Sequence, residues 1–222
     1  GNVFRFDNNN QLMHNKFCVF DNSLLFTGSM NPTDNDIYKN DNNLVVIESL
    51  VIAKNYNDEF EELWSGKFGK GEKVTYQQIL LNQNLTEIKI ENYFCPEDSC
   101  TERIVKILNK ANSGIYFMTY SFTDDTIGQS LLQKKSEGII IQGVFDTLQA
   151  GSKYSQYHVL LKNNITVLKD KNKNIMHHKV FIVDNRVILG SYNPTQSGNE
   201  RNDENILIIH DKNVTEQFVN EF

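Results

Sequence analysis

Short runs of apolar residues, separated by polar turns, fill the first part of the chain. They are rich in Val, Phe and Leu, which favour strands because branched and aromatic side chains pack well on a pleated sheet. Residues 51–64 differ, because Ile52, Tyr56 and Phe60 recur there at near-helical spacing. We therefore predict a helix over this segment, preceded by strands at residues 3–6, 16–20, 24–27 and 44–48.

Helices and strands alternate in the rest of the chain. Ser99 and Glu102 have the spacing of a capping box, which predicts the start of a helix. Residues 123–137 predict a second helix that ends at Gly138, and a third is expected around Tyr157. The alternation predicts an α/β layered fold with a mostly parallel sheet at its centre. Strands are expected at residues 114–120, 139–145, 165–168, 179–183, 186–189 and 205–209, and a connector at residues 65–90.

The polar positions reveal an internal repeat. Residues 13–21 read MHNKFCVFD, and residues 176–184 read MHHKVFIVD. The match continues after both motifs: NSLLFTGSMNPT in the first copy corresponds to NRVILGSYNPT in the second, and NDNNLVVIES corresponds to NDENILIIHD. There is one slip in register. A repeated core would explain the matching apolar positions, but not the matching His, Lys, Ser and Asn. We therefore predict two tandem repeats, the first within residues 1–80 and the second within residues 81–222.

The two repeats are unequal in length. Only the second has a block of strands and helices, at about residues 90–162, before its motif; the first has about a dozen residues there. Without that block, the strands of the first repeat would expose an edge and apolar surface. We therefore expect this chain to be a piece of a longer protein. The preceding segment should resemble residues 90–162, and the chain should continue past Phe222; a second subunit that fills the gap is the alternative.

Composition and cysteine content limit the function only loosely. The 222 residues are 39% hydrophobic and 23% charged, as in an ordinary globular protein. With a net charge of −6, the chain lacks the positive field of many nucleic-acid-binding proteins, although a local basic groove can coexist with this charge. No apolar run approaches the roughly 20 residues that cross a bilayer. We expect Cys18 in the core, and neither a disulfide nor a metal site at Cys95 and Cys100.

The repeated polar residues have the chemistry of a phosphodiester site. On a strand, His14 and Lys16 point to one face with Asn15 opposite, and His177 and Lys179 follow the same rule. The lysines and nearby hydroxyl and amide donors can hold the non-bridging oxygens, while one imidazole attacks phosphorus and the other protonates the leaving oxygen. The candidate donors are Ser29, Asn31, Ser191 and Asn193, which follow Gly28 and Gly190, and a glycine there lets the backbone come close to a bound group.

The motif H-x-K-x4-D followed by G-S-x-N occurs in both repeats. In these residues the chain resembles the phospholipase D superfamily, and TYSFTDD and GIIIQGVFD are similar to its nuclease-like branch. The resemblance implies an α/β/α sandwich of two tandem repeats about a pseudo-twofold axis, the first truncated at its N-terminus. It also implies one shared active site, a covalent phosphohistidine intermediate, and no metal or other cofactor. Asp21 and Asp184 would be mainly structural.

The two halves depart from symmetry after the G-S motif. The superfamily commonly has an acidic residue there that is bonded to a catalytic histidine; the second repeat has Glu204, but the first has Asn42, flanked by Asp41. In the superfamily this acid can reach the histidine of the other half. Glu204 would then orient His14 as the nucleophile, and His177, near Asn42, would be the general acid. Pairing within one repeat would reverse the two roles, and Asp41 could replace Asn42 after a shift in register.

The leading hypothesis is therefore a phosphodiesterase that hydrolyses nucleic acid. The lysine cluster Lys169, Lys171 and Lys173 before the second motif supports it. A phospholipase D or phosphatidyltransferase acting on phospholipids is the alternative, and a fold that only binds a polyanion is the third. Because one chain carries both half-sites, no obligate dimer is expected unless another chain completes the first repeat.

Overall fold

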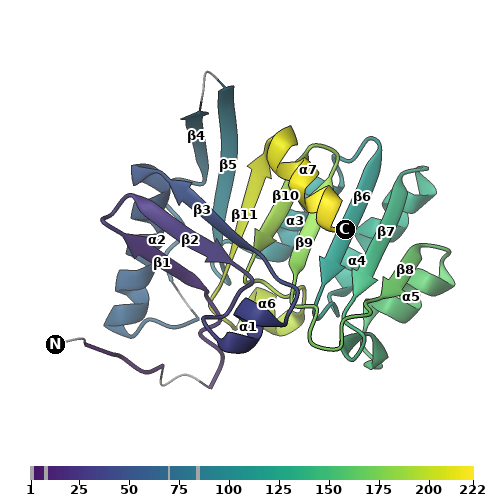
Figure 1. The fold of residues 1–222 in the computed structure, drawn as a ribbon, viewed down its shortest axis with the longest axis horizontal. Coiled ribbons are helices and arrows are strands. Elements are labelled where there is room, and N and C mark those ends of the chain that lie inside the picture. The colour runs from purple at the N-terminus through teal and green to yellow at the C-terminus, as the bar shows by residue number, and fades with distance from the viewer. Residues whose placement is uncertain (1–2, 8–9, 70, 84–85) are drawn as a thin grey trace.

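Two sheets lie in contact in the computed structural model, which describes residues 3–7, 10–69, 71–83 and 86–222 (Figure 1). Within those residues the first repeat forms a three-stranded sheet, with the strands β1 (Phe17–Phe20), β2 (Leu24–Gly28) and β3 (Leu44–Glu48) in that order. The second repeat forms an eight-stranded sheet of order β4-β5-β11-β10-β9-β6-β7-β8. Its strands are β4 (Gln78–Gln83), β5 (Thr86–Cys95), β6 (Gly114–Thr119), β7 (Ile140–Phe145), β8 (Thr166–Lys169), β9 (Lys179–Val183), β10 (Arg186–Gly190) and β11 (Glu204–His210).

The pairing within the sheets corrects one expectation. Only β6 with β7, and β7 with β8, are parallel among the described strand pairs; the others are antiparallel, so the prediction of a mostly parallel sheet is wrong. The short turn after each motif, at Asp21 and Asp184, accounts for two of the antiparallel pairs, β1 with β2 and β9 with β10, and both residues have positive φ. Strands joined by so short a turn can pair only antiparallel, whereas β6, β7 and β8 are linked through helices.

Helices cover both faces of the larger sheet, as a layered α/β/α fold requires. Phe117 on β6 packs against Phe122 on one face, while its neighbour Tyr116 packs against Phe222, after the last helix, on the other. In Figure 1 the last helix lies in front of the sheet, with the helices at Cys100–Leu108 and Asp125–Ser136 behind it. The helices are α1 (Asp34–Tyr38), α2 (Leu50–Ser65), α3 (Cys100–Leu108), α4 (Asp125–Ser136), α5 (Gln156–Lys162), α6 (Gln196–Glu200) and α7 (Lys212–Glu221).

Local signals explain most helix ends. The Ser49 side chain accepts a hydrogen bond from the Ile52 N–H at the start of α2, and Gly66 ends that helix with a φ of 92°. Asp124 caps α4 in the same way. The predicted capping box is wrong, because Ser99 has a left-handed backbone and makes no side-chain cap bond.

The first repeat is covered on one face. Helix α2 packs its buried Ile52 and Tyr56 against β1 and β2. On the opposite face Phe20 and Val46 are 51% and 53% exposed, and Cys18 is exposed rather than in the core as expected. In the described part of the chain no counterpart of α3 and α4 covers this face. The predicted strand at residues 3–6 is also wrong, because residues 3–7 form no regular element and have exposed apolar side chains.

The segment between the repeats is more ordered than expected. Instead of a plain connector, β4 and β5 form an antiparallel hairpin, and β5 pairs with β11 to extend the large sheet. Cys95 and Cys100 form a disulfide at the start of α3, which corrects the expectation that they are unpaired. None of the described helices is both long and apolar enough to cross a membrane.

Candidate active site

Backbone hydrogen bonds between the repeats bring the two motifs together. The His14 N–H donates to the Asp203 carbonyl at 2.9 Å, and the His177 N–H donates to the Asp41 carbonyl at 2.6 Å. The residue before each histidine forms a parallel bridge with the same partner. Each motif strand is thus held beside the segment that leads into the last strand of the other repeat. This exchange is the physical basis of a shared site about a pseudo-twofold axis.

The lysines are held symmetrically. Lys16 Nζ donates to the His14 carbonyl, and Lys179 Nζ to the His177 carbonyl, both at 2.9 Å. Burial lowers the pKa of Lys16 to about 8 and the pKa of Lys179 well below its usual range, and the charge of Lys16 lowers the pKa of Lys179 further. Two ammonium groups that repel each other in a buried place are stabilised by an anion between them. The site therefore suits a phosphate group.

His14 is oriented by Glu204 from the other repeat. Its Nδ1 lies 2.8 Å from Glu204 Oε2, so the predicted pairing between the repeats is confirmed and pairing within one repeat is wrong. Glu204 is fully buried and also accepts a hydrogen bond from the Ser191 hydroxyl at 2.7 Å. A carboxylate that accepts from Nδ1–H leaves Nε2 with its lone pair free. This is the arrangement that a nucleophilic imidazole needs.

His177 faces an acid that sequence analysis missed. Its Nδ1 lies 3.5 Å from Asp36 Oδ2, on α1. Asn42, expected near His177, instead turns its amide to the backbone oxygens of Asp36 and Asn40. The Asp41 side chain accepts from Asn172, so the alternative in which Asp41 replaces Asn42 is wrong.

In the sequence, Asp36 is one of two aspartates in the run TDND, and nothing there separates it from Asp34. Burial acts to raise its pKa, but hydrogen bonds from Asn31 and Asn40 outweigh it and lower that pKa. The carboxylate is therefore charged and can stabilise a protonated His177. The second repeat has Gly198 at the matching position, so this acid breaks the symmetry of the site.

The two histidines differ in environment. His177 is 8% exposed, and its ring packs edge-on against Tyr120 at 5.1 Å. Burial lowers its pKa to about 3, the charge of Lys179 adds to this, and Asp36 opposes it. In the free protein His177 is therefore neutral. A bound phosphate would offset the lysine charges and raise this pKa, which a general acid requires.

Ser29 and Ser191 are buried and Asn31 and Asn193 are half-buried, and several of these side chains already have partners. Ser29 accepts from the Asn43 backbone N–H and amide, at 3.0 and 3.1 Å. Asn31 donates its side-chain amide to Asp36 at 2.7 Å, which fixes that acid. Asn193 has a buried Oδ1 without a hydrogen-bond partner. Ser29 and Asn193 are thus better placed than Asn31 and Ser191 to contact a ligand.

The motif aspartates lie in the turns after their strands. Asp184 accepts from the backbone N–H groups of Asn112, Ser113 and Gly114, and so ties the turn to the start of β6. Asp21 is exposed in the matching turn. Asp184 thus has the contacts of a structural residue, as the resemblance implies.

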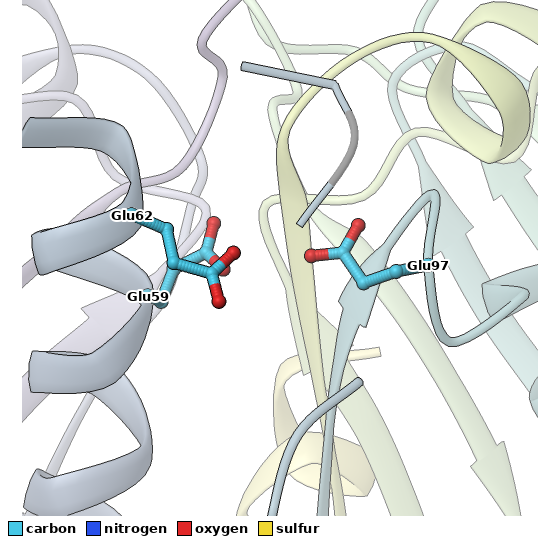
Figure 2. A group of neighbouring side chains, drawn as sticks. All are labelled: Glu59, Glu62 and Glu97. Atoms are coloured by element: carbon cyan, nitrogen blue, oxygen red, sulfur yellow. The ribbon is translucent and has the colours of Figure 1, made fainter. Parts of the chain in front are cut away.

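Three carboxyl groups gather away from the catalytic face (Figure 2). Glu59 and Glu62 on α2 point toward Glu97, and one oxygen of each lies within 4.8 Å of the others. Burial raises the pKa of Glu59 to about 9 and of Glu97 to about 7, and the neighbouring charges add to both. Such a group could hold a cation. Glu59 accepts from Asn15, which points away from the site, so the cluster lies behind the motif strand.

Comparison with known proteins agrees with this geometry. A family model described as "Cardiolipin synthase, PLD-like domain" matches residues 2–64 and 104–222. The chain belongs to the phospholipase D superfamily. It is 33% identical over 136 residues to a phospholipase D of Rickettsia conorii, a match that covers 61% of this chain and 68% of the relative. It is 30% identical over 156 residues to the human mitochondrial cardiolipin hydrolase, covering 68% of this chain and 62% of that protein.

Solved structures of the superfamily have the same fold. Nuc from Salmonella typhimurium superposes with a TM-score of 0.57 and 28% identity, over 61% of this chain and 91% of Nuc. NucT from Helicobacter pylori superposes with a TM-score of 0.58 and 25% identity, over 61% of this chain and 93% of NucT. As a member of the phospholipase D superfamily the protein is a phosphodiester hydrolase. Paired histidines and lysines of the two repeats, brought together in one site, are consistent with that reaction.

Proposed function

We propose that this phosphodiesterase cleaves nucleic acid through a phosphohistidine intermediate, using His14, Lys16, His177 and Lys179. The observation that supports a polymeric substrate is a rim of exposed lysines beside His177, Lys39, Lys171 and Lys173, among which Asp41 and Asp170 also lie. Asn172 donates to the Lys39 carbonyl at 3.1 Å and to Asp41 at 2.8 Å, which joins the loop of Lys171 and Lys173 to the end of α1. All three lysines are exposed, and so is Tyr38 at 78%. Exposed lysines together with an exposed aromatic ring are typical of surfaces that bind single-stranded nucleic acid.

The reaction follows from the two ring positions. Nε2 of His14 attacks phosphorus while Glu204 holds Nδ1–H and stabilises the positive ring. The phosphorus–oxygen bond breaks, and the leaving oxygen takes a proton from His177. His177, now neutral, removes a proton from water, which attacks phosphorus and breaks the nitrogen–phosphorus bond. Lys16, Lys179 and the Ser29 hydroxyl hold the non-bridging oxygens throughout.

The rim predicts a salt-dependent nuclease. Single-stranded DNA or RNA should be cleaved, and kcat/KM should fall as salt is added, because each neutralised phosphate of a single strand contributes a log–log slope of about −0.7. Changing Lys39, Lys171 and Lys173 together to Gln should lower kcat/KM at low salt roughly tenfold and flatten the slope. Lys106, Lys110 and Lys135, exposed near the far ends of α3 and α4, provide the matched triple control, which should change neither quantity.

A lipid substrate is the alternative, and one feature of the same rim favours it. Ile37 and Tyr38 on α1 are 52% and 78% exposed beside Asp36, and apolar side chains there could contact a membrane surface. Relatives are named phospholipase D and cardiolipin hydrolase. Salt-insensitive hydrolysis of phosphatidylcholine or cardiolipin vesicles, with no cleavage of oligonucleotides, would contradict the nucleic-acid proposal and support this one.

Hydrolysis should persist in excess EDTA. Lys16 and Lys179 already supply the positive charge that divalent ions supply in many nucleases. The measurement is the initial rate with and without chelator, together with the melting temperature in the same buffers. The melting temperature is needed because Glu59, Glu62 and Glu97 could bind a cation that affects folding alone. Full loss of activity at unchanged melting temperature, restored by magnesium or zinc, would contradict the proposal.

A further inference from the structure

The residue between His and Lys in each motif ties the two halves together. Asn15 accepts from the Asn205 amide at 2.9 Å, and the Asn205 N–H donates to Ser191 Oγ at 3.0 Å. In the other half, the Asn43 amide lies 3.1 Å from His178 Nδ1, and the Asn43 N–H donates to Ser29 Oγ at 3.0 Å. Each motif strand thus reaches the serine of the opposite repeat through one asparagine.

Each series of contacts ends at a glutamate, but only the first ends in a hydrogen bond. Asn15 donates to Glu59 on α2 at 2.9 Å, and His178 Nε2 lies 3.6 Å from Glu221 on α7. Glu59 and Glu221 hold matching places in YNDEF and FVNEF. His178 is therefore the counterpart of Asn15. The internal repeat thus includes a set of linked side chains behind the site.

The two sets of linked side chains differ in how firmly their asparagines, Asn205 and Asn43, are fixed. The Asn205 Oδ1 accepts from Thr27 Oγ1 and from the Tyr56 hydroxyl, both at 3.1 Å, which sets the direction of its amide. The matching positions in the other half are Leu189 and Phe218, which have no donor to offer. Accordingly the Asn43 Oδ1 is buried without a hydrogen-bond partner. The Asn43 amide can turn over without losing a bond at Oδ1.

The serines differ as well. The Ser191 hydroxyl donates to Glu204, whereas the matching Asn42 turns its amide away from Ser29. Ser29 accepts both the N–H and the amide of Asn43, which leaves its own O–H free for a ligand. A single atom, Asn43 Nδ2, is within 3.1 Å of both Ser29 Oγ and His178 Nδ1. Turning the amide over changes both bonds at once.

We propose that His178 is a positioning residue that controls, through Asn43, whether Ser29 can donate to the substrate phosphate. With Nδ1 unprotonated, His178 accepts from Asn43 Nδ2, and the Ser29 hydroxyl points its proton to the phosphate. With Nδ1 protonated, His178 donates, so Asn43 presents Oδ1 to it. Ser29 then donates to the same Oδ1, and the phosphate loses a hydrogen bond. The inference rests on the proposed role of Ser29 in the phosphodiesterase site.

The surroundings of His178 set the direction of the pH dependence. Burial lowers its pKa; Glu221 from α7 and Asp41 from the segment before β3 oppose this, and Lys179 on its own strand adds to it. His178 is therefore neutral at neutral pH and becomes charged only in acid, so the positioning should fail as pH falls. His178 is 2% exposed and borders a groove of about 710 Å³ together with Asn43 and Glu221.

His178→Asn is the decisive variant, because Asn15 already makes the matching bond. We expect its kcat/KM for bis(p-nitrophenyl) phosphate at pH 8 to stay within about threefold of the wild type, since the amide oxygen replaces Nδ1 as acceptor. The wild type should lose activity more steeply in acid than this variant. In a Ser29→Ala background, His178→Asn should no longer change the acid side of the profile.

Nuclear magnetic resonance of ¹⁵N-histidine in the wild type tests the same inference without catalysis. It should show His178 at neutral pH with Nδ1 unprotonated and Nε2 protonated. A protonated Nδ1 at neutral pH would overturn the proposal, and so would the same acid profile in His178→Asn and wild type. If the wild type does not hydrolyse the diester, the phosphodiesterase site itself fails; if it does and the profiles coincide, only the role of His178 fails.

Discussion

His14→Ala should abolish hydrolysis of a p-nitrophenyl phosphodiester, whereas His177→Ala should keep much of the first step and accumulate a phosphoenzyme. The p-nitrophenolate group leaves without protonation, so losing the general acid costs little, whereas losing the nucleophile removes the reaction path. We expect a loss on the order of 10⁴-fold or more for His14→Ala. With a poor leaving group, His177→Ala should also lose roughly 10²–10⁴-fold.

Intact-mass spectrometry after mixing detects the intermediate. His177→Ala should gain the mass of one phosphoryl-ester group, because no histidine remains to activate water, and a burst of p-nitrophenolate should match the enzyme concentration. His14→Ala should show neither. The opposite pattern would make His177 the nucleophile, which its neutral state in the free protein permits. Equal losses in both variants would mean that the contacts of Glu204 and Asp36 do not divide the roles.

The second large effect concerns the acids behind the two histidines, which provide a matched pair. Glu204→Gln should lower kcat roughly 10²–10⁴-fold, because a neutral amide neither stabilises the positive phosphohistidine ring nor fixes Nδ1–H as donor. Asp36→Asn should cost much less with p-nitrophenyl substrates, because its contact to His177 is longer, 3.5 Å against 2.8 Å, and serves the acid that this leaving group does not need.

Circular dichroism of both variants would separate catalysis from folding. Glu204 is fully buried and bonded to Ser191, so its variant needs a folded signal before the rate is interpreted. With an alkyl leaving group Asp36→Asn should fall toward Glu204→Gln, because protonation then limits the rate. Equal activity of Glu204→Gln and wild type would contradict the nucleophile assignment.

Much of the fold could be predicted because its signals are local. The strands predicted from residue 16 onward agree with the structure to within about one residue, since short runs of branched and aromatic side chains pack on a sheet; β4 and β5 were not predicted. Helix α2 was equally clear, because Ile52 and Tyr56 form a repeating apolar face. The strand predicted at residues 3–6 failed for the opposite reason: apolar residues form a strand only beside another strand, and residues 3–6 pair with no strand among the described residues.

The sequence by itself determined which side chains share a face. Alternation on a strand places His14 with Lys16 and His177 with Lys179, and the repeat shows that the two pairs hold matching positions. These facts depend only on neighbours along the chain. The pairing of Cys95 with Cys100 and the β4–β5 hairpin needed more, because a turn's geometry decides them.

Only the tertiary structure decided which groups meet across the two repeats. Glu204 reaches His14, and Asp36 reaches His177, because backbone hydrogen bonds place each motif strand beside the other half. Burial then lowers the pKa of Lys16 to about 8, and this effect comes from the packing around Lys16, not from its neighbours along the strand. Contacts between distant segments and loss of solvent depend on how the sheets pack, and sequence spacing carries no record of either.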